Sequence, residues 1–263
     1  MNIAKSLYIL FSTKQKLNSN YKINFLEENM REKVVIKGDS REVVYSQEHW
    51  KLFHNLREKT RRIMEVLAVN GINCIVHGSI ARGDVHRNSD IDILIPYTIS
   101  SYKVELAIES LKLDVLSREI TQATPLHVVK AHFKFVDNII ITFPMMEMRK
   151  LEREFYRFGG EADLNDIIDG RRKPGVSKKL LLIEPTEFGH IETPIVGREE
   201  YVAKVLGVSI DIVKERERVL IRRDEIGRTG VYLKYVLAPN ENFEEVFKRI
   251  LDRDPAIKRR SRL

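Results

Sequence analysis

The chain has 263 residues, of which 43% are hydrophobic and 32% are charged. This length is typical of one large domain or two smaller ones, and the hydrophobic content excludes an intrinsically disordered chain. Because 45 basic side chains face 38 acidic ones, the net charge of +7 suits a polyanionic partner such as nucleic acid or a nucleotide.

Composition also restricts the compartment and the kind of site. Cys74 is the only cysteine, which excludes a disulfide framework and a cysteine-cluster zinc site and suits a reducing cytosol. No apolar run approaches the ~20 residues that span a bilayer. We therefore expect a cytoplasmic protein without a membrane partner. The low glutamine content, beside many charged residues, favours a thermophilic source.

Helix and strand signals alternate along much of the chain. Ser46 is a suitable N-cap for a long helix, and turn residues predict hairpins at residues 33–45 and 227–237. Apolar periodicity predicts helices at residues 46–70, 101–111, 147–158, 198–206, 209–223 and 241–251. Short apolar runs predict strands at residues 72–76, 91–97, 118–124, 127–136 and 139–143. The expected fold is therefore α+β, with a mixed sheet.

The most informative segment is "IVHGSIARGDVHRNSDIDILI" at residues 75–95. An apolar strand leads into Gly78 and Ser79, where a helix begins. Because Gly78 lacks a Cβ, a phosphate can approach the backbone, and the free N–H groups of the helix start point toward it. Ser79 adds a hydroxyl donor, and Arg82 adds a positive charge one turn later. These residues predict a phosphate-binding loop.

Two aspartates follow this loop on a predicted strand. Asp90 and Asp92 are two positions apart, so their side chains share one face, while Ile91 and Ile93 face the core. Two carboxylates on one face repel each other unless a cation lies between them. Oxygen ligands favour Mg²⁺ or Mn²⁺, which also bind substrate phosphates. The pair therefore predicts a divalent-metal site beside the phosphate loop.

The spacing of these residues resembles the signature of the nucleotidyltransferase superfamily with the DNA polymerase β-like fold. Gly78-Ser79 is followed, after ten residues, by Asp90-Ile91-Asp92-Ile93. The form Gly-Ser-x-Ala-Arg-Gly followed by Ser-Asp-x-Asp is most similar to the minimal nucleotidyltransferases. The whole chain also resembles predicted archaeal nucleotidyltransferases that have a C-terminal helical domain.

This resemblance implies a reaction and a set of site residues. A nucleoside monophosphate would pass from an NTP to an acceptor hydroxyl of RNA, protein or a small molecule, with release of pyrophosphate. Asp90 and Asp92 would bind two Mg²⁺ or Mn²⁺ ions. Gly78, Ser79 and Arg82, together with Ser89 of the motif, would bind the nucleotide.

Active relatives usually carry a third carboxylate on the next strand of the sheet. We expect Glu119 to be this catalytic residue and metal ligand, because it lies on the predicted strand that follows the helix. Asp137, at a predicted turn, and Asp114, at a helix end, remain alternatives.

The resemblance and the element pattern together predict four segments. They are an N-terminal extension with a hairpin (1–45), the catalytic domain (46–160), a connector (161–190) and a mostly helical C-terminal domain (191–263). Within the last segment, residues 198–223 have the proportions of a helix-turn-helix, which would bind DNA or pack as two ordinary helices. The basic stretches 169–179 and 258–262 would contact phosphates or carry solvated charge.

Two other functions fit the same residues. A chain that lacks the third carboxylate would bind nucleotide or nucleic acid as a non-catalytic regulator. Some minimal nucleotidyltransferases are components of toxin–antitoxin pairs and modify a partner protein, which is the third possibility.

Overall fold

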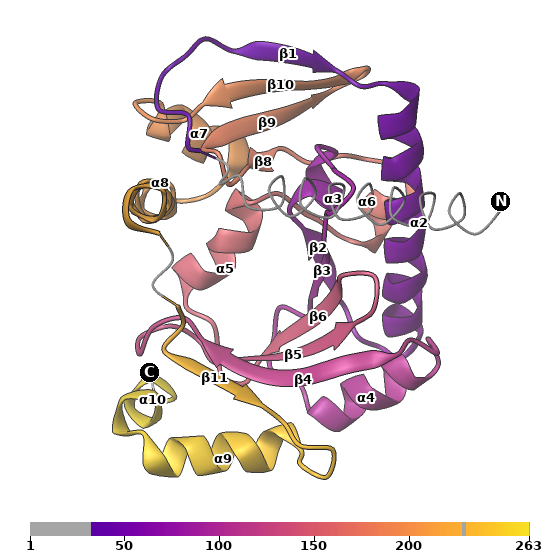
Figure 1. Ribbon diagram of the computed structural model, residues 1–263, viewed down its shortest axis with the longest axis vertical. Coiled ribbons are helices and arrows are strands. Elements are labelled where there is room, and N and C mark those ends of the chain that lie inside the picture. Colours follow the sequence, from indigo (N-terminus) through magenta and orange to yellow (C-terminus); the bar gives the residue numbers. More distant parts are fainter. Residues whose placement is uncertain (1–32, 228–229, 263) are drawn as a thin grey trace, which may run out of the picture. The chain divides into compact units, whose positions relative to one another are not determined.

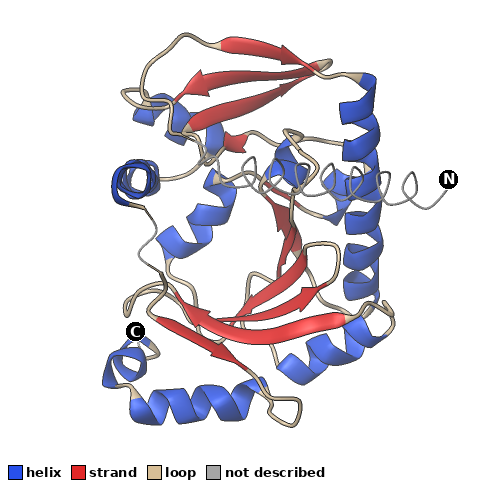
Figure 2. Cartoon of the chain, in the orientation of Figure 1, coloured by secondary structure: helices blue, strands red, loops and turns tan. Residues whose placement is uncertain are grey.

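The computed structural model describes residues 33–227 and 230–262. Val34–Leu263 make up a single compact unit. Within it, the strands form two sheets and the helices pack around them (Figures 1 and 2), so the α+β fold expected from the sequence is confirmed. In the part of the chain that the structure describes, no helix is long and apolar enough to cross a membrane.

The larger sheet has seven strands in the order β11-β4-β5-β6-β3-β2-β7. Their bounds are β2 Ile75–His77, β3 Ile91–Leu94, β4 Val115–Gln122, β5 Lys130–Phe135, β6 Ile139–Pro144, β7 Glu161–Ala162 and β11 Leu233–Val236. Within the described residues, β3 and β6 pair in parallel, whereas all other neighbouring strands of this sheet are antiparallel. The sheet is therefore mixed, as the sequence predicts.

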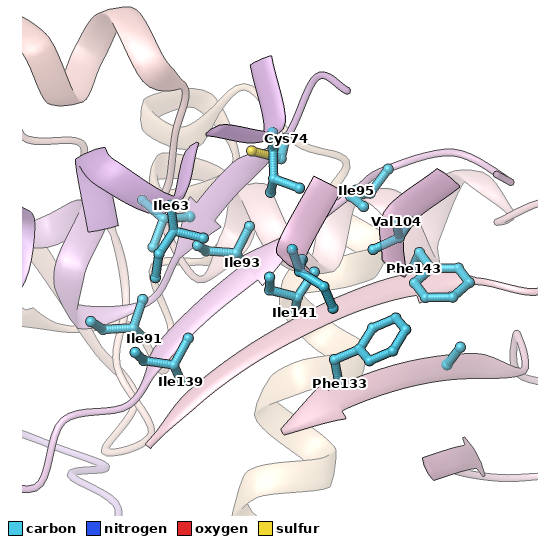
Figure 3. Packing of buried hydrophobic residues seen from close by; sticks show 14 of the residues in the cluster. Ile63, Cys74, Ile91, Ile93, Ile95, Val104, Phe133, Ile139, Ile141 and Phe143 are labelled. Carbon is cyan, nitrogen blue, oxygen red and sulfur yellow. The ribbon is translucent and has the colours of Figure 1, made fainter. Parts of the chain in front are cut away.

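The two faces of this sheet differ in polarity. Because neighbours in register share a face, one face carries Ile91, Ile93, Ile139 and Ile141, and these side chains join one buried core (Figure 3). The other face begins with Asp92 and continues onto the outer strands as a largely polar surface. One side of the sheet is therefore buried, whereas the side that carries Asp92 is polar on the outer strands and packs Leu94 and Ile75 against Tyr156.

Helices cover the apolar face and connect the strands. Their bounds are α2 Gln47–Val69, α3 Ser79–Arg82, α4 Ser101–Glu109, α5 Lys150–Phe158, α6 Leu164–Ile168, α7 Glu199–Leu206, α8 Ile210–Ile226, α9 Phe243–Arg253 and α10 Pro255–Arg260. The core under the sheet takes side chains from α2, α4 and α9, including Leu67, Val104 and Phe243. Ser46 caps α2 by accepting the N–H of His49 at 3.2 Å, which confirms the predicted helix start.

The smaller sheet has four strands in the order β1-β10-β9-β8. Their bounds are β1 Arg41–Val44, β8 Gly175–Val176, β9 Leu181–Thr186 and β10 Gly189–Pro194. A second core joins this sheet to α7 and α8, through residues such as Leu182, Val202 and Val213. Gly207 adopts the left-handed conformation between the two helices, so the predicted pair of helices is present. The role of these two helices as a DNA-binding helix-turn-helix stays a prediction.

Several sequence expectations differ from the observed elements. The predicted hairpin at 33–45 does not form within the described residues, because β1 pairs with β10 instead of with residues 33–37. The predicted hairpin at 227–237 provides only β11, which pairs with β4. The hairpin β9–β10 was not expected, and the basic tail forms α10 with Arg260 buried. The expected domain limits stay predictions; the part of the N-terminal extension up to residue 32 lies outside the described residues.

Candidate active site

β2 leads into the phosphate loop through Gly78. Its φ of 82° and ψ of −144° form a conformation that residues with side chains rarely adopt, and α3 begins at the next residue. The N–H of Gly78 donates to the carbonyl of Gly160 at 2.9 Å, which attaches the loop to the segment after α5. A Cβ on Gly78 would meet no atom of the described residues within 4 Å. The space beside this backbone is therefore open to a ligand.

Ser79 and Ser89 join the two ends of the motif. The Ser79 hydroxyl donates to Oγ of Ser89 at 3.2 Å, and the same Oγ accepts the N–H of His86 at 2.9 Å. Ser89 is buried, and Asp90 follows it directly. The contact therefore brings the phosphate loop beside the first aspartate.

Asp90 and Asp92 lie at the beginning of β3. Asp92 pairs across the sheet with His77, the residue before Gly78. Burial raises the pKa of Asp92, and the positive charge of Lys178 opposes this shift. Burial and then the negative charge of Asp92 raise the pKa of Asp90. The charge of Asp92 thus acts on Asp90, and the role of the two carboxylates as one metal site stays a prediction.

Arg82 is buried behind the loop. Its Nε and Nη2 donate to the carboxylate of Asp84 at 2.9 and 2.8 Å, and its Nη1 donates to the carbonyl of Gly159 at 2.5 Å. These contacts hold α3 against the end of α5. The placement differs from the phosphate contact expected from the sequence, because the guanidinium is occupied by groups of the protein.

Arg57 of α2 supports the loop from another direction. Its Nε donates to the carbonyl of Ile80 at 3.2 Å, and its Nη2 donates to the carbonyls of Ala81 at 3.2 Å and Arg171 at 2.8 Å. Burial lowers the pKa of Arg57 to about 10. Sequence reasoning missed this residue. The available signal was its place four residues after Phe53, on the buried stripe of the predicted helix.

Gly83, the last glycine of the motif, is required by packing. Its φ is 112°, and a Cβ there would lie 2.8 Å from Cδ of Arg172. His49 Nε2 lies 2.8 Å from the carbonyl of Gly83, and Arg172 donates to the carbonyl of Gly189 at 2.7 Å. The loop is thereby attached to the smaller sheet.

Lys178 adds a positive charge near the aspartates. It is exposed on the turn between β8 and β9, and its charge acts to lower the pKa of both Asp90 and Asp92. The preceding segment is fixed to the loop, since the N–H of Lys173 donates to the carbonyl of Ala81 at 3.0 Å. Lys178 belongs to the basic stretch 169–179, for which the sequence left a phosphate contact as one interpretation.

Glu119 lies on β4, and both β5 and β6 separate this strand from β3. Its buried carboxylate pairs with Lys134 at 2.8 Å and with Lys234 at 3.6 Å, and it accepts the hydroxyl of Ser117 at 3.0 Å. Burial acts to raise the pKa of Glu119, but hydrogen bonds from Lys134 and Ser117 lower it overall. The structure does not bring Glu119 to the two aspartates.

The alternatives for a third carboxylate lie elsewhere. Asp137 is in the turn between β5 and β6 and pairs with Lys59 of α2 at 2.8 Å, toward the face that α2 covers. Asp114 directly precedes β4. The β6 residue that pairs with Asp92 is Ile140. Among the described residues, no group of three or more His, Cys, Asp or Glu side chains could hold a metal ion.

The comparison with known families matches residues 57–153 to the nucleotidyltransferase domain. These residues form a nucleotidyltransferase domain. The match begins within α2 and ends within α5, so it includes Gly78, Asp90 and Asp92. The resemblance read from the motif is therefore confirmed, and nucleotidyl transfer is the general activity of such a domain.

Other comparisons give little beyond this family. One solved structure, described as "structure of GLD-2/RNP-8 complex", has 17% identity and a TM-score of 0.26. The similarity covers 44% of this chain and 46% of that one, so this chain spans less than half of its length. No curated protein matches the chain.

The carboxylates of the nucleotidyltransferase domain fit one divalent cation whose remaining ligands would come from water and substrate. Asp90 and Asp92 offer two carboxylates with raised pKa, which is the state that a bound cation would relieve. Mg²⁺ usually binds to one or two carboxylates and completes its octahedron with waters and substrate phosphates. A second cation held by protein alone does not fit, because the described residues supply no third acid beside the pair.

Proposed function

We propose that this chain is a metal-dependent nucleotidyltransferase that moves a nucleoside monophosphate from an NTP to an acceptor hydroxyl. The acceptor oxygen forms a bond to the α-phosphorus, the bond from that phosphorus to the bridging oxygen breaks, and pyrophosphate leaves. The hydroxyl proton passes to solvent or to a neighbouring base. The observation that carries the proposal is the Asp90–Asp92 pair beside the open backbone of Gly78.

Each residue of the site has a distinct role in this proposal. Gly78 and Ser79 bind the β- and γ-phosphates, and Ser89 holds the Ser79 hydroxyl in place. Asp90 and Asp92 bind Mg²⁺ or Mn²⁺, which would neutralise charge on the phosphates when bound. Lys178 adds a positive charge that acts on both aspartates. Arg82 and Arg57 keep the loop in shape and do not touch substrate.

The proposal is tested by incubating the protein with α-labelled NTPs and Mg²⁺ or Mn²⁺, alone and with RNA or protein acceptors. Asp90→Asn and Asp92→Asn should each reduce label transfer by at least about 100-fold, because each removes an anionic ligand of the cation that would neutralise the reacting phosphates. Asp252→Asn, at an exposed position of α9, controls for the loss of one carboxylate away from the site. Equal labelling by the wild type and both site variants would refute the proposal.

A second candidate function is nucleotide binding without turnover. The observation in its favour is that Glu119 is two strands removed from β3 and that Ile140 occupies the position opposite Asp92. A regulator of this kind would bind Mg²⁺ and NTP but release no pyrophosphate with any acceptor. Isothermal titration with a non-hydrolysable NTP, beside the transfer assay, distinguishes the two functions.

A further inference from the structure

The polar face of the larger sheet extends beyond Asp92 onto β6, β5 and β4. His132 pairs in register with Thr142, and its ring nitrogens lie 2.9 Å from Oγ1 of Thr142 and 2.7 Å from Oγ1 of Thr121 on β4. Lys130 and Lys134 lie two residues to either side of His132, so they share this face. All five side chains are partly exposed. A sheet face of this composition is not a core surface.

Two cations at the edge of this face lack an acidic partner. Lys130 Nζ lies 5.8 Å from the ring centre of Phe155, and the Arg216 guanidinium of α8 lies 4.8 Å from the same ring. Lys130 is also 4.9 Å from the ring centre of Tyr156. Within the described ranges neither cation has a carboxylate at ion-pair distance, and Nε of Arg216 has no hydrogen-bond partner. Two positive groups around one ring repel each other, so an anion between them would be stabilised.

The other charged side chains on this face add to the positive charge. Lys134 and Lys234 share the single carboxylate of Glu119, which leaves one uncompensated charge. Asp92 lies on the same face, so with Lys130 and Arg216 the surface carries two positive charges in excess. We call Lys130, Lys134, Lys234, Glu119, Arg216 and Phe155 the cationic face.

The position of the cationic face separates it from the NTP phosphates. Gly78 and Ser79 follow β2, which lies on one side of β3, whereas β6 and β5 lie on the other side. Ring contacts connect the face to the site, because His77 lies 4.9 Å from Tyr156 and pairs across the strands with Asp92. An acceptor on this face would approach the aspartates from the side opposite the phosphate loop.

We propose that the cationic face binds a single-stranded nucleic acid, whose terminal hydroxyl is the acceptor, with Lys130 and Arg216 contacting its phosphates. The proposal rests on the function proposed above, since it names the substrate class of that site.

Three properties of the face favour this class. Surfaces that bind single strands combine positive groups along the backbone with aromatic rings, and here Lys130 and Arg216 both lie close to the ring of Phe155. Lys130 and Lys134 are four residues apart on β5, about 13 Å along the strand, which corresponds to roughly four stacked nucleotides. The chain also has a net charge of +7, which favours association with a polyanion.

Binding of labelled single-stranded RNA and DNA oligonucleotides of about 12 nucleotides, followed by fluorescence anisotropy at several salt concentrations, tests the proposal. Lys130→Gln, Arg216→Gln and the double variant keep the aliphatic contacts with Phe155 but remove the charges. Lys204→Gln, on the exposed side of α7, is the matched control. We expect the double variant to bind at least about 10-fold more weakly and to show a salt slope smaller by about 1–2.

The same variants are titrated with Mg²⁺ and a non-hydrolysable NTP, for which we expect affinities equal to the wild type. Unchanged oligonucleotide binding by the double variant, or a loss of NTP affinity in its place, would overturn the proposal. Wild-type binding of an acidic peptide as tightly as RNA would also overturn it. The binding experiment needs no turnover, so oligonucleotide binding without any transfer would refute only the enzymatic function. Transfer to an acceptor without nucleic acid, together with unchanged oligonucleotide binding by the double variant, would refute only the role of the cationic face.

Discussion

Asp90 and Asp92 make the folded chain less stable at neutral pH than at acidic pH. Their pKa values in the folded state are raised, by burial in both cases and by the charge of Asp92 at Asp90. Between the unfolded pKa near 3.8 and the raised folded pKa, the folded state binds more protons than the unfolded state. The contribution of these two carboxyl groups to the free energy of unfolding therefore falls as pH rises through this interval. A cation that binds to the two carboxylates in the folded state would offset this loss of stability.

The double variant Asp90→Asn/Asp92→Asn tests the direction in which these two carboxylates change the free energy of unfolding with pH. In the absence of divalent ions, its free energy of unfolding should exceed that of the wild type at pH 7, and the difference should shrink as the pH falls toward 4. Adding Mg²⁺ should raise the stability of the wild type but not of the variant. Urea titrations at several pH values measure all three effects. A wild type that gains stability relative to the variant as pH rises would contradict the assigned shifts.

Ile140 marks the missing third ligand. It pairs with Asp92 on the parallel strand β6 and shares its face, at the position nearest to the two aspartates on that strand. Ile140→Asp should therefore tighten Mg²⁺ binding about 10-fold, which is 1.4 kcal/mol, and raise the Mg²⁺-dependent increase in Tm by roughly 3–5 °C. Ile140→Asn has the same size without the charge and serves as the control. Equal Mg²⁺-dependent shifts in both variants would show that position 140 does not face the cation.

At the scale of elements, the phosphate loop is held in shape by an arginine of a different helix. Arg57→Met should destabilise the chain by about 3 kcal/mol, because two buried carbonyls and one partly buried carbonyl lose a charged donor. The matched control is Arg61→Met on the same helix, where the arginine is 39% exposed and pairs with Glu58 and Glu65. That change should cost less than about 1 kcal/mol. Chemical denaturation measures both, and equal losses would contradict the role of Arg57.

The motif was predictable from sequence because its constraints are local. Gly78, Ser79 and the alternation at Asp90 and Asp92 follow from backbone freedom and from the period of a strand. Strand order separates Glu119 from Asp92, and this order depends on how β4, β5 and β6 pair, which the sequence does not reveal. The polar alternation at 117, 119 and 121 was visible in the sequence, but it indicates a polar face and not a distance from Asp92.

Errors in the other elements also come from tertiary pairing. Residues 33–45 carry the turn chemistry of a hairpin, yet β1 pairs with β10, which lies about 150 residues later in the chain. The tail was interpreted by its charge, although Asp254 followed by Pro255 is a helix-start signal: Asp254 accepts the N–H of Ala256 at 2.9 Å. A local signal predicts a helix or strand, whereas the strand or helix that it packs against depends on the rest of the fold.

At the scale of the whole molecule, the C-terminal residues complete the core under the nucleotidyltransferase sheet. β11 extends the sheet beyond β4, and Phe243 packs 5.1 Å from Phe133 between ring centres. The Glu244 carboxylate accepts both the N–H and the hydroxyl of Ser101 at 2.7 Å. Arg260 donates to Glu152 at 2.7 Å and to the carbonyl of Leu126 at 3.0 Å. The family match at 57–153 therefore covers only part of the cooperative unit that carries this site.

A fragment of residues 46–160, the catalytic domain expected from sequence, should not fold cooperatively by itself. It would expose the edge of β4 and the rings of Phe133 and Phe143, and the N-terminus of α4 would lose its carboxylate cap. Residues 34–263 should instead unfold in one transition, because the C-terminal segments share the core of the sheet. Thermal unfolding followed by circular dichroism, with a hydrophobic dye to detect exposed apolar surface, compares the two. A sharp transition and no dye binding in the short fragment would show that the motif, the sheet and α2 are sufficient, and that the C-terminal residues serve the acceptor and not the fold.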